Sequence, residues 1–106
     1  DVGTDVHDME YMYMETKWVT GIDASHGGSG DPSPFTAHGV VMGIKACVKE
    51  KFNQDSLKGL RIAVQGMGNV GRHLVDYLHK EKAIITICDI DADKTKAISK
   101  NILPSF

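Results

Sequence analysis

Three glycines at fixed spacing, Gly66, Gly68 and Gly71, lie in the stretch VQGMGNVG and could bring backbone N–H groups against a phosphate. A G-x-G-x-x-G pattern that follows a strand and opens a helix gives each glycine a role. The first glycine permits a tight turn, and the second lets a pyrophosphate approach the backbone. The third lets the helix pack closely against the strand. The first N–H groups of the helix are also free to bind an anion. The pattern alone is weak evidence, since 11 of the 106 residues are glycine.

An aspartate stands where the ribose of a dinucleotide would be bound. Asp89 follows Gly71 by 18 residues, directly after the apolar run AIITIC, and about 20 residues is the typical spacing. A carboxylate there accepts hydrogen bonds from ribose hydroxyls but repels a 2′-phosphate, so the pattern predicts NAD rather than NADP as the cofactor. A glycine turn in some other doubly wound fold is the alternative. The dinucleotide-binding residues predicted in this segment are Gly66, Gly68, Asn69, Val70, Gly71, Asp89 and Ile90.

The acidic run DIDADK, residues 89–94, also resembles the start of a calcium-binding loop. Lys94 stands where such a loop requires glycine, however, and Lys100 stands where it requires glutamate. We therefore expect Asp91 and Asp93 to serve the N-terminus of a helix. The five histidines show no pairing four residues apart, and the two cysteines lack the spacing of metal ligands. No metal site is expected.

Apolar and β-branched runs on both sides of the glycines predict the elements that position them. Residues 60–66, LRIAVQG, predict a buried strand, a helix is expected from about Asn69 to Lys80, and residues 83–91 predict a second strand. Strand, glycine turn, helix and strand form a βαβ unit, whose sheet is parallel. The predicted fold class is therefore α/β, with the Rossmann-type βαβ of a doubly wound dinucleotide-binding domain.

The first half of the chain predicts a short helix, a loop and a long helix. Residues 5–15 carry apolar side chains at helical spacing after Thr4, the predicted N-cap, and residues 20–34 are rich in Gly, Ser, Asp and Pro, which predicts a loop. Ser33 as N-cap and Pro34 as the first residue begin the long helix. One buried stripe is predicted on it: Val40, Val41, Ile44, Cys47 and Val48.

Two glycines on the long helix also require an explanation. Gly39 and Gly43 lie four residues apart and therefore share a face. Each lowers helix propensity by about 1 kcal/mol relative to alanine. We therefore expect another helix or a cofactor to approach this face closely.

Composition argues against several classes of partner. Twelve basic and fourteen acidic residues give a formal charge of −2, which disfavours nucleic acid or an anionic membrane as the main partner. No apolar run approaches the roughly 20 residues that span a bilayer. Two isolated cysteines, Cys47 and Cys88, favour a reduced, cytoplasmic setting.

In chain order, these segments resemble the glutamate/leucine/phenylalanine/valine dehydrogenase superfamily, and its branched-chain branch more than its glutamate branch. The matching stretches are DVGTDVHDM, TKWVTG, SGDPSPFTAHGVVMGIKA, LKGLRIAVQGMGNVGRHL and CDID. The resemblance implies NAD-dependent oxidative deamination of a leucine-like L-amino acid to the 2-oxo acid and ammonia, with hydride transfer from Cα to nicotinamide. Phenylalanine, tryptophan or valine is the alternative substrate. A non-catalytic NAD-binding fragment is the alternative if the chain is complete as given.

The resemblance also implies two site residues outside the glycine loop and a domain arrangement. Asp1 matches a catalytic aspartate that passes protons together with a lysine, and Thr36 resembles a threonine that contacts the nicotinamide end of the cofactor. The family's lysines lie upstream of the DVGT stretch, so we expect the middle of a longer enzyme. Residues 1–34 would end the substrate domain, 35–56 would form a connecting helix, and 57–106 would begin the NAD-binding domain. A homo-oligomer, formed through parts outside this chain, is also implied.

Overall fold

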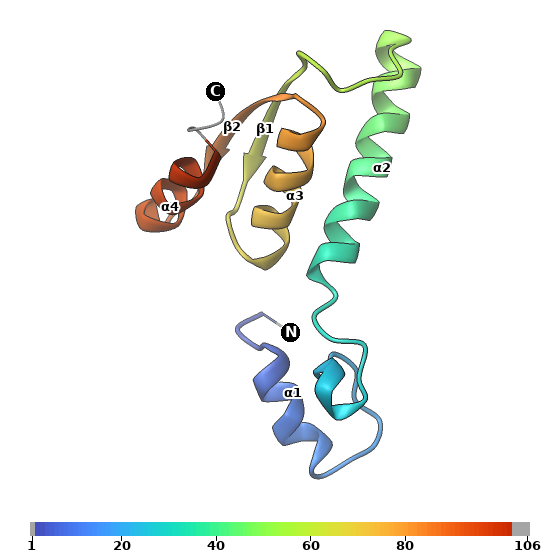
Figure 1. The fold of residues 1–106 in the computed structure, drawn as a ribbon, viewed down its shortest axis with the longest axis vertical. Helices are drawn as coiled ribbons and strands as arrows, with labels where there is room; N and C mark the ends of the chain where they lie inside the picture. Colours follow the sequence, from blue (N-terminus) through green and yellow to red (C-terminus); the bar gives the residue numbers. More distant parts are fainter. Residues whose placement is uncertain (1, 103–106) are drawn as a thin grey trace. The chain divides into compact units, whose positions relative to one another are not determined.

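The structure is a computed structural model that describes residues 2–102, with the last two of these described in their backbone only. The chain divides into two compact units, Asp1–Pro32 and Ser33–Phe106. The elements, in chain order (Figure 1), are α1 (Val6–Tyr13), a short 3-10 helix (Ala24–His26), α2 (Ser33–Phe52), β1 (Arg61–Gln65), α3 (Asn69–Lys80), β2 (Ile84–Cys88) and α4 (Ala92–Ile102). None of the helices within residues 2–102 combines the length and apolar character needed to cross a membrane.

The first unit holds α1 and the polar loop that was predicted after it. The N-cap of α1 is Asp5, so the prediction of Thr4 is wrong by one residue. Asp5 Oδ1 accepts from the backbone N–H of Asp8 at 3.0 Å, and Asp8 Oδ2 accepts from that of Asp5 at 2.9 Å. Two carboxylates thereby satisfy two N–H groups reciprocally, and this capping box determines where the helix begins.

The long helix α2 begins the second unit and already includes Ser33, one residue earlier than predicted. The side chains of Ala37, Val41 and Val48 are buried along one face. The prediction of burial is wrong for two members of the stripe, because Val40 is 41% exposed and Cys47 is exposed. Each lies one residue before a buried valine, and one residue rotates a side chain by about 100° around the helix axis.

The second unit contains the predicted βαβ unit. Strands β1 and β2 are parallel, with Arg61 opposite Ile84 and Gln65 opposite Cys88. Helix α3 covers one face of this sheet and packs against α2 on its other side (Figure 1). The α/β class is confirmed, and so are the bounds of the helix after the glycines. The buried core consists of Val41, Val48, Leu57, Val64, Met67, Val75, Leu78 and Ala83.

Two details of the core differ from the sequence-based expectations. The segment between α2 and β1 is mostly polar in sequence, which favours an exposed connection, yet Leu57 within it is completely buried. The first strand was expected to be buried, yet the residues of β1 alternate in exposure, and so do those of β2, where Ile84 is 52% exposed. Successive strand residues point to opposite faces of a sheet. Within the described residues, the face opposite α3 is therefore left accessible.

Candidate functional site

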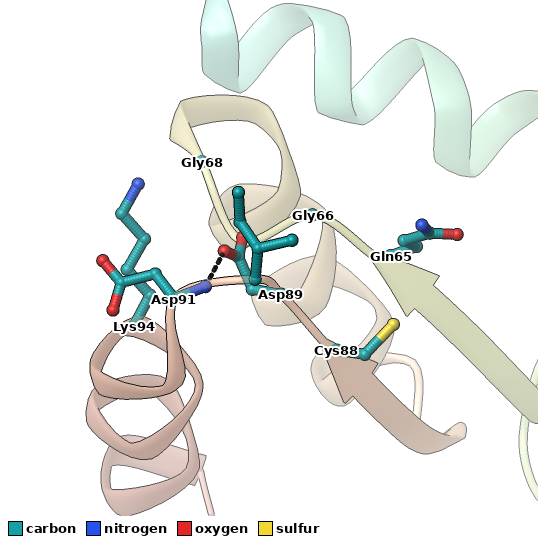
Figure 2. Close-up of a pocket in the computed structure, with 8 residues that line it drawn as sticks. Gln65, Gly66, Gly68, Cys88, Asp89, Asp91 and Lys94 are labelled. Carbon is teal, nitrogen blue, oxygen red and sulfur yellow. Dashed lines mark hydrogen bonds between the residues drawn. The ribbon is translucent and has the colours of Figure 1, made fainter.

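A cavity of about 720 Å³ lies at the carboxyl ends of both strands. Gln65 ends β1 and Cys88 ends β2, and the parallel register places these two residues opposite each other. Open α/β sheets bind ligands at this edge. The cavity is lined by Gln65, Gly66, Gly68, Cys88, Asp89, Ile90, Asp91 and Lys94, most of which are labelled in Figure 2.

The glycine loop connects β1 to α3 through a turn that depends on two of its glycines. Gly66 has φ +95°, a conformation that side chains rarely adopt, and its N–H donates to the carbonyl oxygen of Cys88 at 2.8 Å. A Cβ atom on Gly71 would collide with the carbonyl oxygen of Gly66. The chain can therefore turn this tightly only if position 71 has no side chain.

The remaining glycine of the loop faces open space. Nothing within the described residues lies within 4 Å of a Cβ built on Gly68. Gly68 is also the N-cap of α3, and no side chain makes a capping hydrogen bond there. The N-terminus of α3 therefore presents backbone N–H groups and the positive end of the helix dipole without a side-chain acceptor, which is how helices bind phosphate groups.

Asp89 is anchored by backbone N–H groups on both sides. Its Oδ2 accepts from Met67 in the glycine loop at 2.5 Å, and its Oδ1 accepts from Asp91 at 2.7 Å, the dashed line in Figure 2. These two bonds, and to a smaller extent the positive charge of Lys94, hold the pKa of the Asp89 carboxyl below its ordinary value. A carboxylate has about four acceptor positions, so Asp89 can still accept hydrogen bonds from a ligand.

The first turn of α4 is capped by the next acidic residue. Asp91 Oδ1 accepts from the backbone N–H of Asp93 at 3.0 Å. The expectation that this acidic run serves a helix N-terminus is thus confirmed for Asp91. Within residues 2–102 no group of three or more His, Cys, Asp or Glu side chains is placed to hold a metal ion.

The structure brings together some of the predicted site residues and separates others. Four of them line the cavity: Gly66, Gly68, Asp89 and Ile90, the last with a fully exposed side chain. Asn69 and Val70 begin α3 just beyond the cavity lining, and Gly71 supports the loop by close packing. Thr36 lies exposed in the first turn of α2 and does not line the cavity, and Asp1 lies outside the described residues.

The cavity is also lined by four residues that the sequence did not identify as binding residues. Gln65 and Cys88 are the last residues of the two strands, so the rule that ligands meet strand ends would have found them. Asp91 and Lys94 belong to the turn into α4. Lys94 was considered only as a mismatch to a calcium loop, and no feature of the sequence alone indicates that its side chain reaches this cavity.

Comparison with known proteins is consistent across sequence and structure. Residues 27–93 match the family model described as Glutamate/Leucine/Phenylalanine/Valine dehydrogenase. Leucine dehydrogenase of Geobacillus stearothermophilus is 53% identical over 93 residues, which are 88% of this chain and 25% of that protein. Valine dehydrogenase of Streptomyces virginiae is 41% identical over 90 residues, 85% of this chain and 25% of that protein.

A solved structure extends the likeness to three dimensions. The crystal structure of L-tryptophan dehydrogenase from Nostoc punctiforme matches with a TM-score of 0.70 and 32% identity, covering 96% of this chain and 27% of that one. The chain thus spans about a quarter of the length of these relatives. The family model covers more than half of the chain and includes α2, the glycine loop and Asp89. The chain therefore belongs to the glutamate/leucine/phenylalanine/valine dehydrogenase family.

Proposed function

We propose that the protein carrying this chain is an NAD-dependent amino-acid dehydrogenase that oxidatively deaminates a branched-chain, leucine-like L-amino acid. The observation that supports it most is the cavity at the strand ends, where an uncapped helix N-terminus and the anchored carboxylate of Asp89 face the same space. The helix N-terminus suits a pyrophosphate, and the carboxylate suits ribose hydroxyls. This chain would supply the site for the adenosine half of the cofactor.

The residues around the cavity divide the recognition of the cofactor among them. Gly68 leaves room for the pyrophosphate against the N–H groups that open α3 at Asn69 and Val70. Asp89 accepts hydrogen bonds from the ribose hydroxyls with its unused acceptor positions. Ile90, whose apolar side chain is exposed at the cavity wall, packs against the adenine. The nicotinamide at the other end of NAD accepts the hydride that leaves the substrate Cα.

Two proposed site residues act away from this cavity. Thr36 contacts the nicotinamide end of the cofactor, and its exposed position in the first turn of α2 keeps it accessible for that role. Asp1 transfers protons during the hydrolysis of the imine to the 2-oxo acid and ammonia, as its match to the family's catalytic aspartate suggests. Residues 1–34 belong to the substrate domain, 35–56 connect the domains and 57–106 begin the cofactor domain. The enzyme is a cytoplasmic homo-oligomer.

The leucine-like substrate is favoured by the order of similarity among the relatives. Identity falls from 53% with a leucine dehydrogenase to 41% with a valine dehydrogenase and 36% with a tryptophan dehydrogenase. The activity is tested by supplying the protein with NAD and a panel of L-amino acids and following the formation of NADH. We expect turnover of leucine and other branched-chain substrates; turnover of phenylalanine or tryptophan alone would refute the substrate assignment.

The cofactor assignment has its own test in the same assay. Replacing Asp89 by alanine removes the acceptor for the ribose hydroxyls and also removes the charge that repels a 2′-phosphate. We therefore expect Asp89→Ala to weaken NAD binding more than NADP binding. An unchanged ratio of the two dissociation constants would refute the role of Asp89 at the ribose.

A further inference from the structure

A positive charge stands on the wall of the cavity beside the carboxylate that faces the ribose. Lys94 lies in the first turn of α4 and lines the same cavity as Asp89. In Figure 2 its side chain extends from α4 alongside Asp91, with the ammonium at about the height of Gly68 in this view. None of the ion pairs found within residues 2–102 involves Lys94. Its charge is therefore available to a ligand in the cavity.

Asp89 and Lys94 respond in opposite ways to a phosphate on the ribose. The Asp89 carboxylate is fixed by Met67 and Asp91, so it cannot turn away from an additional negative charge. The long, unbranched lysine side chain can move its ammonium toward that charge. The two side chains already interact, since Lys94 helps to lower the pKa of the Asp89 carboxyl. A 2′-phosphate in this space would be repelled by one and attracted by the other.

Given the dinucleotide function proposed above, we propose that Lys94 is a specificity-determining residue that binds a 2′-phosphate on the adenosine ribose. Asp89 and Lys94 together set the preference between NAD and NADP. The preference for NAD is consequently smaller than Asp89 alone would impose. A site without Asp89 already contains the cation that NADP requires.

Other lysines of α4 provide a matched control. Lys96 is on the same helix, is exposed and carries the same charge, but it does not line the cavity. A general effect of positive charge near the cofactor phosphates would appear with either residue. A specific contact with the 2′-phosphate requires Lys94.

The experiment measures dissociation constants of NAD and NADP by calorimetry for the full-length protein and for Lys94→Met, Lys96→Met, Asp89→Ser and the double variant Asp89→Ser/Lys94→Met. We expect Lys94→Met to weaken NADP relative to NAD by about threefold to fivefold, the upper part of the range for an ion pair with solvent access. Lys96→Met should leave the ratio within about twofold of the unmodified protein. Asp89→Ser should favour NADP, and the double variant should lose most of that gain.

The outcomes separate this inference from the function on which it rests. If the unmodified protein binds NAD but Lys94→Met leaves the NADP-to-NAD ratio unchanged, Lys94 does not bind the 2′-phosphate and the inference is wrong. An equal change in the ratio for Lys94→Met and Lys96→Met would overturn it as well. If the unmodified protein binds neither nucleotide, the proposed function fails, and the role of Lys94 fails with it.

Discussion

Two single substitutions in the glycine loop should separate folding from cofactor binding. In Gly71→Ala the new methyl group meets the backbone carbonyl of Gly66, which cannot move aside as a flexible side chain could. Overpacking of this kind costs about 1–3 kcal/mol of unfolding free energy. For a unit of this size, that lowers the midpoint of thermal unfolding by roughly 4–24 °C.

The partner substitution, Gly68→Ser, should have the opposite profile. Its Cβ enters open space, and serine is a good N-cap for α3, so unfolding free energy should change by less than about 0.5 kcal/mol. The same side chain occupies the approach to the loop N–H groups, and its hydroxyl competes for them. We therefore expect NAD to bind at least about tenfold more weakly, a loss of about 1.4 kcal/mol.

Both variants are measured by thermal unfolding followed by circular dichroism and by calorimetric titration with NAD. Unchanged NAD affinity in a stable Gly68→Ser protein would refute the pyrophosphate site at this loop. An unfolding midpoint of Gly71→Ala equal to that of the unmodified protein would refute the close packing of α3 on the turn. The two outcomes are independent, because the effect of Gly68→Ser depends on the open space beside the loop, whereas the effect of Gly71→Ala depends on packing within the protein.

Three further predictions concern the supporting structure. The pKa of the Asp89 carboxyl is lowered from 3.8, so its contribution to stability is present above about pH 4 and is lost as the pH falls through the lower folded value. In urea unfolding between about pH 6 and pH 2, the unfolding free energy of Asp89→Asn should therefore fall less with acid than that of the unmodified protein. An identical pH profile for the two proteins would contradict the anchoring role of Asp89. The Lys45–Glu81 pair joins α2 to α3 with an Nζ–Oε1 distance of 2.7 Å, and the two side chains are 31% and 36% exposed. A double-mutant cycle should give a coupling free energy of about 0.5 kcal/mol that decreases as salt is added. A coupling that does not change with salt would argue against an ion pair. The new methyl group of Gly39→Ala would enter open space beside α2, so this variant should raise the unfolding free energy of this chain by about 0.4–1 kcal/mol. A lower unfolding free energy in chemical denaturation would mean that a neighbour covers this face.

The βαβ unit could be predicted from the sequence because several local signals agree there. The β-branched run of β1, the three glycines and the apolar spacing of α3 each specify the same chain path without help from distant residues. Prediction was less accurate where burial depends on rotation about a helix. Val40 and Val41 are chemically alike, and only the packing of α2 against α3 determines which of the two is buried.

The buried position of Leu57 could not be predicted for a related reason. It lies in a polar stretch, and a lone apolar residue gives no periodicity from which to infer a face. In the structure it is completely covered and joins the core formed by α2, β1 and α3. The N-cap of α1 was misplaced because Thr4 and Asp5 are both good capping residues. The reciprocal bond with Asp8 favours Asp5.

Asp89 shows what a spacing rule leaves out. The distance from the glycines predicts a carboxylate beside the ribose, but it does not predict that Met67 and Asp91 would each donate a hydrogen bond to that carboxylate. Loss of the side chain therefore has two effects, since it removes an acceptor for the ribose and also releases the glycine loop. The second effect should weaken NAD and NADP equally, because both carry the same pyrophosphate. Only the ratio of the two affinities isolates the ribose contact, whereas the loss of affinity common to both measures how strongly Asp89 holds the loop in place.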